Sequence, residues 1–289
     1  MGSPSKAQSD GGDRSTGYCD TLILQLIEDL PTIGRPIIVG LSGPQGSGKS
    51  TAASRIADTL TKRCRPAAVL SLDDFYLPRA ERLELARSVH PLLLTRGVPG
   101  THDVDLAKDC LLRLGEPAAM APVQVPRFDK LADDRADRSD WRPIGRPLEV
   151  IIFEGWCVGA RPQPECELAI PVNDLERNED PEGVWRHFVN AQLEGPYHEL
   201  FGMLDAVVAF RAQSFAIVEQ WRAEQEASMA ASTRRQRAMN GPELRRFISH
   251  FERLTRWMDA QPSADLLIDI DDDRLALGHC RKDANEAGS

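Results

Sequence analysis

The glycine-rich run from Gly43 to Ser50, with the letters GPQGSGKS, constrains this chain more than any other feature. It matches the pattern GxxxxGK[ST], in which glycines let successive backbone N–H groups turn toward phosphate oxygens. An apolar run at 36–41 precedes it, and a segment with helical character at 50–62 follows it. The N-terminus of that helix would add partial positive charge at the turn. The sequence therefore predicts a phosphate-binding loop between a strand and a helix.

Each residue of such a loop has an expected task. Lys49 bridges the β- and γ-phosphates of ATP, and the hydroxyl of Ser50 binds the Mg²⁺ that accompanies them. The remaining residues expected around the nucleotide are Gly43, Pro44, Gln45, Gly46, Ser47, Gly48 and Thr51. The alternative is a glycine turn with an incidental lysine, but the position between a strand and a helix favours the phosphate loop. We therefore expect ATP and Mg²⁺ as cofactors.

Apolar strands alternate with helical segments along the whole chain. This order predicts a three-layer α/β fold with a mostly parallel central sheet covered on both faces. We expect strands at 36–41, 67–72, 123–125, 148–153, 206–210 and 265–270, and helices at 21–30, 50–62, 81–89, 105–114, 182–200, 215–231 and 242–260. A charged loop is expected at 127–142, and an acidic tail after residue 270.

Three of the expected strands end on a polar group, where ligands of parallel sheets bind. The first ends at the glycine loop, the second at Asp73 and Asp74, and another at Glu154. Glu154 could hold Mg²⁺ through water; the alternative is an exposed strand-end acid. Asp73 could take the proton from an attacking hydroxyl or orient that hydroxyl. Because side chains alternate along an extended segment, only one of the two aspartates should face the substrate, and we favour Asp73.

Composition excludes several function classes. The formal net charge of -9 argues against a protein that neutralises nucleic-acid phosphates. Six cysteines without CxxC spacing are typical of reduced thiols, and no apolar run reaches the roughly 18 residues of a membrane span. We expect a disordered segment at 1–20, one domain at 21–289, a cytoplasmic location, and neither nucleic-acid nor membrane partners. The oligomeric state cannot be predicted from these features.

Two motifs resemble a known group of enzymes. The segment 71–76 with Phe153, Glu154 and Gly155 is similar to P-loop kinases that include uridine kinase, pantothenate kinase and phosphoribulokinase. Within that group the chain resembles the plant-type D-glycerate 3-kinases and their uncharacterised fungal relatives, at 94–103, 125–130, 134–137 with Trp141, 153–156 and 221–226. The resemblance implies a P-loop NTPase fold with a helical lid at about 211–240, and transfer of the γ-phosphate of ATP to the 3-hydroxyl of D-glycerate. It also implies that Asp73 is the catalytic base and that Arg222 is an arginine of the lid.

A carboxylate-bearing acceptor needs cationic groups in its pocket. The candidates are Arg96, Arg127, Lys130 and Arg135, each of which could instead be a solvated loop charge. Asp103 could bind acceptor hydroxyls or cap the helix that follows it. His102 could orient Asp103 or make a structural hydrogen bond.

Two alternatives to a glycerate kinase stay open. One is a kinase for a nucleoside, pantothenate or a sugar phosphate, and the other is a non-catalytic ATP-binding regulatory protein. The presence of Lys49, Ser50, Asp73 and Glu154 together weighs against the second.

Overall fold

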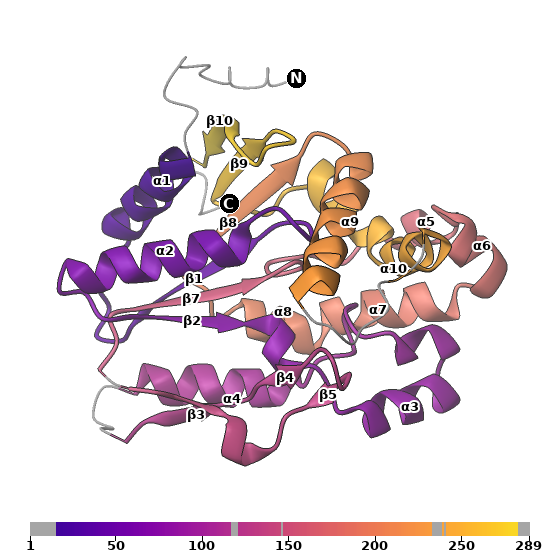
Figure 1. Cartoon of the computed structure of the whole chain (residues 1–289), viewed down its shortest axis with the longest axis horizontal. Coiled ribbons are helices and arrows are strands. Elements are labelled where there is room, and N and C mark those ends of the chain that lie inside the picture. Colours follow the sequence, from indigo (N-terminus) through magenta and orange to yellow (C-terminus); the bar gives the residue numbers. More distant parts are fainter. Residues whose placement is uncertain (1–15, 117–120, 146, 233–238, 240, 283–289) are drawn as a thin grey trace.

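A computed structural model describes residues 16–116, 121–145, 147–232, 239 and 241–282, with the backbone alone at residue 16 and residues 225–232. Its centre is a six-stranded sheet with the order β10-β9-β8-β1-β7-β2 (Figure 1). The strands are β1 Ile37–Ser42, β2 Ala67–Ser71, β7 Val150–Gly155, β8 Ala206–Ala212, β9 Leu266–Ile270 and β10 Ala276–Arg281. All neighbours pair in parallel except β10, which is antiparallel to β9. The predicted α/β class is confirmed.

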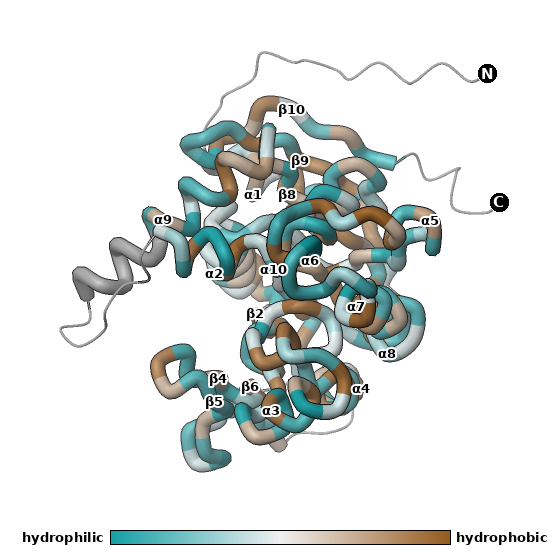
Figure 2. The backbone as a smooth tube through the Cα atoms, turned by 90° about the vertical axis from the view of Figure 1, so that its right-hand side faces the viewer, coloured by the Kyte–Doolittle hydropathy of each residue, from teal (hydrophilic) through white to brown (hydrophobic). Residues whose placement is uncertain are grey.

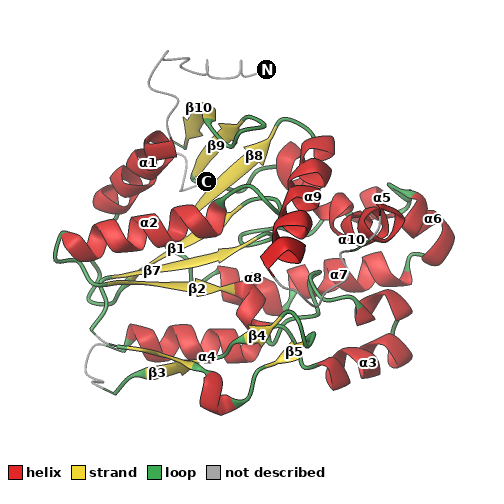
Figure 3. Ribbon diagram, viewed as in Figure 1, coloured by secondary structure: helices red, strands yellow, loops and turns green. Residues whose placement is uncertain are grey.

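Helices cover both faces of this sheet (Figure 3). Along β1, Ile37, Val39 and Leu41 face a core shared with α1, α2 and α9, whereas Ile38 faces a core shared with α4, α8 and α10. Every residue of β1 and β7 is buried, as expected for central parallel strands that are covered on both sides. The helices are α1 Thr16–Asp29, α2 Lys49–Lys62, α3 Arg79–Ser88, α4 Val104–Gly115, α5 Glu165–Leu168, α6 Asp174–Glu179, α7 Val184–Glu194, α8 Pro196–Phe201, α9 Phe215–Ser232 and α10 Gly241–Ala260.

Two small antiparallel pairs lie outside the main sheet. Strand β3 Val123–Val125 pairs with β6 Arg142–Ile144, and β4 Phe128–Asp129 pairs with β5 Asp134–Arg135. The β4–β5 hairpin and α3 lie at the end of the molecule opposite β10 (Figures 1 and 2). Three short 3-10 helices complete the described elements: η1 Leu72–Phe75, η2 Pro91–Leu94 and η3 Arg138–Asp140.

Several sequence expectations need correction. The single helix expected at 182–200 is two helices, because Pro196 cannot donate the helical hydrogen bond and a new helix starts there. The expected acidic tail after residue 270 begins with a hairpin that adds β10 to the sheet. The first helix starts at Thr16, five residues before its expected start, while residues 1–15 of the expected N-terminal segment lie outside the described residues. Within the described part of the chain, no helix is long and apolar enough to cross a membrane.

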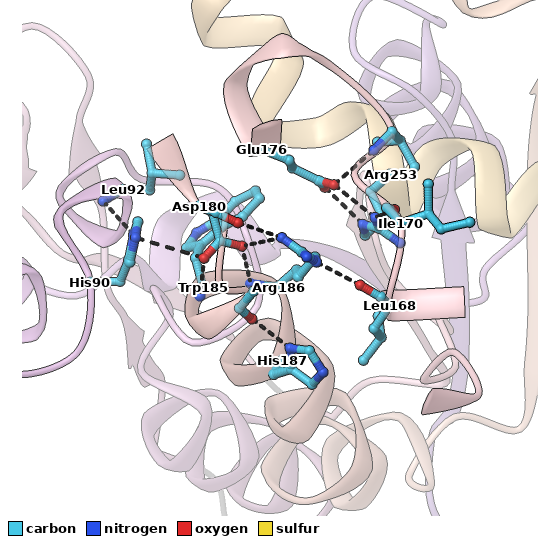
Figure 4. A network of polar contacts seen from close by, with 12 residues as sticks. His90, Leu92, Leu168, Ile170, Glu176, Asp180, Trp185, Arg186, His187 and Arg253 are labelled. Carbon is cyan, nitrogen blue, oxygen red and sulfur yellow. Dashed lines mark hydrogen bonds and ion pairs between the residues drawn. The ribbon is translucent and has the colours of Figure 1, made fainter. Parts of the chain in front are cut away.

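One buried ion pair fixes the position of α10, and a second one joins α7 to the end of α6 (Figure 4). Arg253 on α10 donates to both carboxylate oxygens of Glu176, at 2.7 Å each, and to the carbonyl oxygen of Ile170 at 2.6 Å. The side chains of Arg253 and Glu176 are only 8% and 0% exposed. A second buried pair joins Arg186 to Asp180 at 3.0 Å. Because these charges are desolvated and also hydrogen-bonded to backbone, removing one partner would leave the other unpaired in the interior.

Candidate active site

The phosphate loop connects the carboxyl end of β1 to the first turn of α2. Gly46 and Gly48 have φ angles of 80° and 84°, in the left-handed region where a side chain causes strain. A Cβ on Gly46 would also lie 2.5 Å from Cβ of Trp221, which is fully buried in α9. Glycine at this position therefore lets α9 pack directly against the loop. Thr51, in the first turn of α2, is exposed.

Glu154 lies between the two strands that carry the other candidate groups. In the sheet it is opposite Leu41 of β1 and Ser71 of β2. The glycine loop and Asp73 each begin two residues beyond those partners, so the strand register brings all three features to one edge. This arrangement agrees with the expectation from the strand ends.

The carboxylate of Glu154 suits a position beside a metal ion. Its Oε1 atom accepts a hydrogen bond from Ser50 Oγ at 3.0 Å. Its Oε2 atom is buried and has no hydrogen-bond partner among the described residues. Among all residues that the structure describes, no group of three or more His, Cys, Asp or Glu residues could hold a metal ion by itself. Mg²⁺ commonly binds through one or two protein oxygens together with phosphates, and Ser50 with Glu154 fit that mode.

Asp73 lies in η1, directly after β2. Its Oδ1 accepts a hydrogen bond from the phenol of Tyr76 at 2.8 Å, and its Oδ2 accepts one from Lys130 Nζ at 2.6 Å. Burial raises the pKa of Asp73, but the charges of Lys130 and Lys49 outweigh that effect and hold the pKa well below its usual range. Asp73 is therefore ionised at neutral pH, between the lysine of the phosphate loop and a lysine of the β4–β5 hairpin.

Asp74 has a different environment from its neighbour. Its carboxylate accepts a hydrogen bond from the backbone N–H of Phe128 at 3.4 Å, and burial raises its pKa. It therefore contacts the start of the β4–β5 hairpin, while Asp73 contacts Lys130 of the same hairpin.

Ion pairs and hydrogen bonds hold the β4–β5 hairpin in place. Arg135 donates to the carbonyl oxygen of Tyr76 at 3.1 Å and to Asp103 at 3.0 Å. Asp133 pairs with Arg82 at 3.1 Å and also with Arg96. The guanidinium carbon of Arg96 lies 5.3 Å from the ring centroid of Phe128. Arg96, Lys130 and Arg135 thus all form ion pairs at this hairpin, and Arg127, like Lys130, is exposed.

Asp103 and His102 both make structural contacts. Asp103 caps α4 by accepting a hydrogen bond from the N–H of Leu106 at 3.1 Å. His102 stacks on Tyr76 with ring centroids 4.6 Å apart, and its Nδ1 lies 2.6 Å from the hydroxyl of Tyr197. Burial lowers the pKa of His102 to about 3, so the ring is neutral at physiological pH. His102 therefore contacts the same Tyr76 that binds Asp73.

Arg222 lies on α9, and its guanidinium carbon is 5.1 Å from the ring centroid of Phe247 on α10. The helix carrying it is Phe215–Ser232, so much of the expected lid at 211–240 is helical. Residues 233–238 and 240, with Arg234, Arg235 and Arg237 among them, lie outside the described residues.

Sequence reasoning missed several residues that position this site. Tyr76 lies in the motif at 71–76 without an expected role of its own, yet it binds Asp73 directly. Arg274, in the hairpin between β9 and β10, donates from Nε to the carbonyl oxygen of Gly46 at 2.6 Å and lies 5.2 Å from the ring of Trp221. Arg82 is fully buried under the β4–β5 hairpin. No sequence pattern indicates these long-range contacts. The sequence shows only that Arg82 lies on an expected helix rich in charge, where an arginine can be buried only if it has partners.

Comparison with known proteins identifies the family. The chain is 36% identical over 238 residues to the uncharacterized kinase mug58 of Schizosaccharomyces pombe, covering 79% of this chain and 83% of that protein. It is 32% identical over 265 residues to the chloroplastic D-glycerate 3-kinase of Arabidopsis thaliana, covering 86% of this chain and 54% of that enzyme. No protein-family model matches the chain.

A solved structure has the same fold. The D-glycerate 3-kinase of Cryptococcus neoformans superposes with a TM-score of 0.75 at 24% identity, covering 94% of this chain and 100% of that one. The parallel sheet, with its loop at the end of β1, and the sequence relatives point to the same family. The chain belongs to the family of P-loop kinases that includes the plant D-glycerate 3-kinases.

Proposed function

We propose that this kinase transfers the γ-phosphate of ATP to the 3-hydroxyl of D-glycerate and releases ADP and 3-phosphoglycerate. The observation that carries the proposal is the position of Asp73, an ionised carboxylate between Lys49 of the phosphate loop and Lys130 of the β4–β5 hairpin. A phosphate donor on the Lys49 side and an anionic acceptor on the Lys130 side would meet at this carboxylate. The similarity to a plant D-glycerate 3-kinase at 32% identity supports glycerate as that acceptor.

The residues would divide the work as follows. The backbone of the loop and Lys49 hold the phosphates, and Ser50 with Glu154 would hold Mg²⁺, which offsets phosphate charge when bound. Asp73 orients the acceptor hydroxyl and takes its proton as the oxygen attacks the γ-phosphorus. Arg222 would close over the phosphates from α9, and this closure would exclude water from the γ-phosphate.

The acceptor side carries the cations that a small carboxylate needs. Lys130 and Arg135 of the β4–β5 hairpin are paired with Asp73 and Asp103, Arg96 is paired with Asp133 of the same hairpin, and the exposed Arg127 could join them at the acceptor. Asp103 and His102 would act on the acceptor only through the residues they contact, because Asp103 already caps α4 and His102 already binds Tyr197. A neutral acceptor such as a nucleoside would not use these positive charges.

The test is an acceptor panel with purified protein and Mg-ATP. D-glycerate should give ADP and 3-phosphoglycerate, identified by mass spectrometry and a coupled enzyme assay. Nucleosides, pantothenate and sugar phosphates form the other arms, and preference for any of them would move the proposal to that acceptor. No ADP formation with any arm would refute the kinase assignment to this site.

Two matched variants test the role of Asp73. Asp73→Asn should lower turnover by about 100- to 10,000-fold and leave ATP binding within about threefold, because it removes only the proton acceptor. Asp74→Asn makes the same charge change one residue away and can still accept from the N–H of Phe128, so its turnover should stay within about tenfold. Equal losses in the two variants would contradict the role of Asp73.

A domain at 21–289 with a lid at 211–240, and a cytoplasmic location without nucleic-acid or membrane partners, stay predictions.

A further inference from the structure

Both carboxylate oxygens of Asp73 already have partners in this structure. Tyr76 donates to Oδ1 at 2.8 Å and Lys130 donates to Oδ2 at 2.6 Å. A carboxylate paired with an ammonium group is a weaker proton acceptor than a free one, because protonation would break the pair. The group expected to receive a proton is therefore restrained at the start of the reaction.

The two partners of Asp73 differ in their freedom to move. Tyr76 is 4% exposed, stacks on His102 and makes an edge-to-face contact with Phe128. The Lys130 side chain is 47% exposed at the tip of the β4–β5 hairpin. A lysine ammonium lies at the end of a flexible four-carbon chain and can exchange partners without a backbone shift. Lys130 is thus the partner that can leave Asp73.

The hairpin that carries Lys130 is itself fixed. Asp129 accepts hydrogen bonds from the N–H groups of Leu131 and Ala132 at 2.8 and 3.2 Å, which closes the turn next to Lys130. Arg135 ties the second strand to Asp103 and to the backbone of Tyr76. A change of partner by Lys130 therefore needs only new side-chain torsions.

We propose that Lys130 is a latch on Asp73 that the carboxylate of an acidic acceptor releases. This inference rests on the proposed function and adds a mechanism for its specificity. In glycerate, two carbon atoms separate the carboxyl carbon from the 3-hydroxyl oxygen, so both ends can reach two protein groups that touch each other. The substrate carboxylate takes the ammonium of Lys130, and the freed Oδ2 of Asp73 meets the acceptor hydroxyl.

The released state then performs the transfer. The hydroxyl oxygen forms a bond to the γ-phosphorus, the bond from that phosphorus to the bridging oxygen of ADP breaks, and Asp73 takes the hydroxyl proton. Water and neutral alcohols bring no carboxylate, so they leave Lys130 on Asp73. The latch would select acidic acceptors and would suppress the hydrolysis of ATP to ADP and phosphate when no acceptor is bound.

Substitution of Lys130 separates a latch from a plain substrate contact. Lys130→Met removes the charge and keeps the length of the side chain, and Lys130→Arg keeps the charge. The control is Lys62→Met, which removes an exposed lysine at the opposite end of α2 from the loop. Three rates are measured: ATP hydrolysis without acceptor, phosphorylation of glycerol, and phosphorylation of D-glycerate. Thermal melting and ATP affinity verify that each variant is folded.

The latch predicts changes of opposite sign. In Lys130→Met, kcat/KM for D-glycerate should fall by about 10- to 100-fold, because a hydrogen bond to a charged group is lost. Acceptor-free ATP hydrolysis and glycerol phosphorylation should each rise by about tenfold, because Asp73 is no longer restrained. Lys130→Arg should retain low hydrolysis, and Lys62→Met should equal the wild type.

Other outcomes overturn the inference. A loss with glycerate and no gain with water or glycerol makes Lys130 only a substrate contact. No change in any rate makes it a surface charge. If the wild type prefers an acceptor other than glycerate, the proposed function fails, but the hydrolysis rates of Lys130→Met and the wild type still decide whether the latch exists. An unfolded methionine variant would be replaced by Lys130→Gln, which is read by the same criteria.

Discussion

The contact between the phosphate loop and α9 can be tested with two glycine substitutions. Gly46→Ala places a Cβ 2.5 Å from Cβ of Trp221 and 3.2 Å from its carbonyl carbon. Gly48→Ala places a Cβ in open space, with its nearest neighbour, Cδ of Arg274, at 4.0 Å. The two glycines have nearly the same φ, 80° and 84°. Gly48→Ala is therefore a matched control that carries the backbone strain without the collision.

The magnitudes follow from these distances. A left-handed conformation costs an alanine about 1–2 kcal/mol, and both variants share that term. Gly46→Ala adds overpacking of about 1–3 kcal/mol. The collision involves backbone and Cβ atoms of Trp221, which a rotamer change cannot move. Gly46→Ala should therefore be less stable than Gly48→Ala by about 1–3 kcal/mol in the free energy of unfolding.

Urea denaturation followed by tryptophan fluorescence and by circular dichroism measures this difference, provided that the two signals coincide. ATP affinity, measured by calorimetry, should also fall further in Gly46→Ala, because displacement of the loop moves its N–H groups. Equal losses of stability in the two variants would refute the reasoning. The direct packing of α9 on the loop would then not restrict the residue at 46.

Three further predictions concern Glu154, a buried ion pair and a buried histidine. Glu154→Gln should raise the Mg²⁺ concentration needed for half-maximal activity by about 10- to 100-fold in a Mg²⁺ titration, and no rise would contradict a metal-side role. Arg253→Met should lower the free energy of unfolding by about 3–5 kcal/mol in urea denaturation, because Glu176 is left buried without its partner, and adding Glu176→Gln should restore part of the loss. Burial lowers the pKa of His250 to about 4, so the unfolded chain binds the proton first as pH falls below about 6.5, and stability is lost between that pH and about 4. Between pH 7 and pH 5, His250 should lower the free energy of unfolding by about 2 kcal/mol. His250→Gln should therefore have a flatter pH dependence of stability than the wild type. A slope as steep as that of His198→Gln, the control at an exposed histidine, would exclude His250 as the cause.

Local patterns in the sequence predicted the frame of this molecule. The central strands read as uninterrupted apolar runs because both of their faces are buried, and this signal needs no knowledge of the partner strand. The glycine loop, Asp73 and Glu154 follow such runs directly, so their arrangement at one edge could be predicted from the parallel sheet alone.

Contacts between distant segments could not be predicted in the same way. The pair Lys130–Asp73 depends on where a charged loop folds back, and nothing in a solvated stretch of alternating charges indicates a partner. Arg274 belongs to a segment expected to be an acidic tail, because its three preceding aspartates concealed a hairpin. The helix break at Pro196 has a local signal, the proline itself. The helical spacing of the residues around it nevertheless led to the prediction of a single helix.

The register of β7 also has a consequence for folding. Ile37 pairs with Val150 on one side and Val39 pairs with Ala206 on the other, so β1 cannot be enclosed until both later strands have been synthesised. Pairings with such large sequence separation form late, because closing the chain between them costs entropy before any contact is gained. Glu154 therefore reaches Ser50 only after β7 has paired with β1. Nucleotide binding by a nascent or refolding chain would then indicate that the central strands have paired. Partly folded chains would not consume ATP.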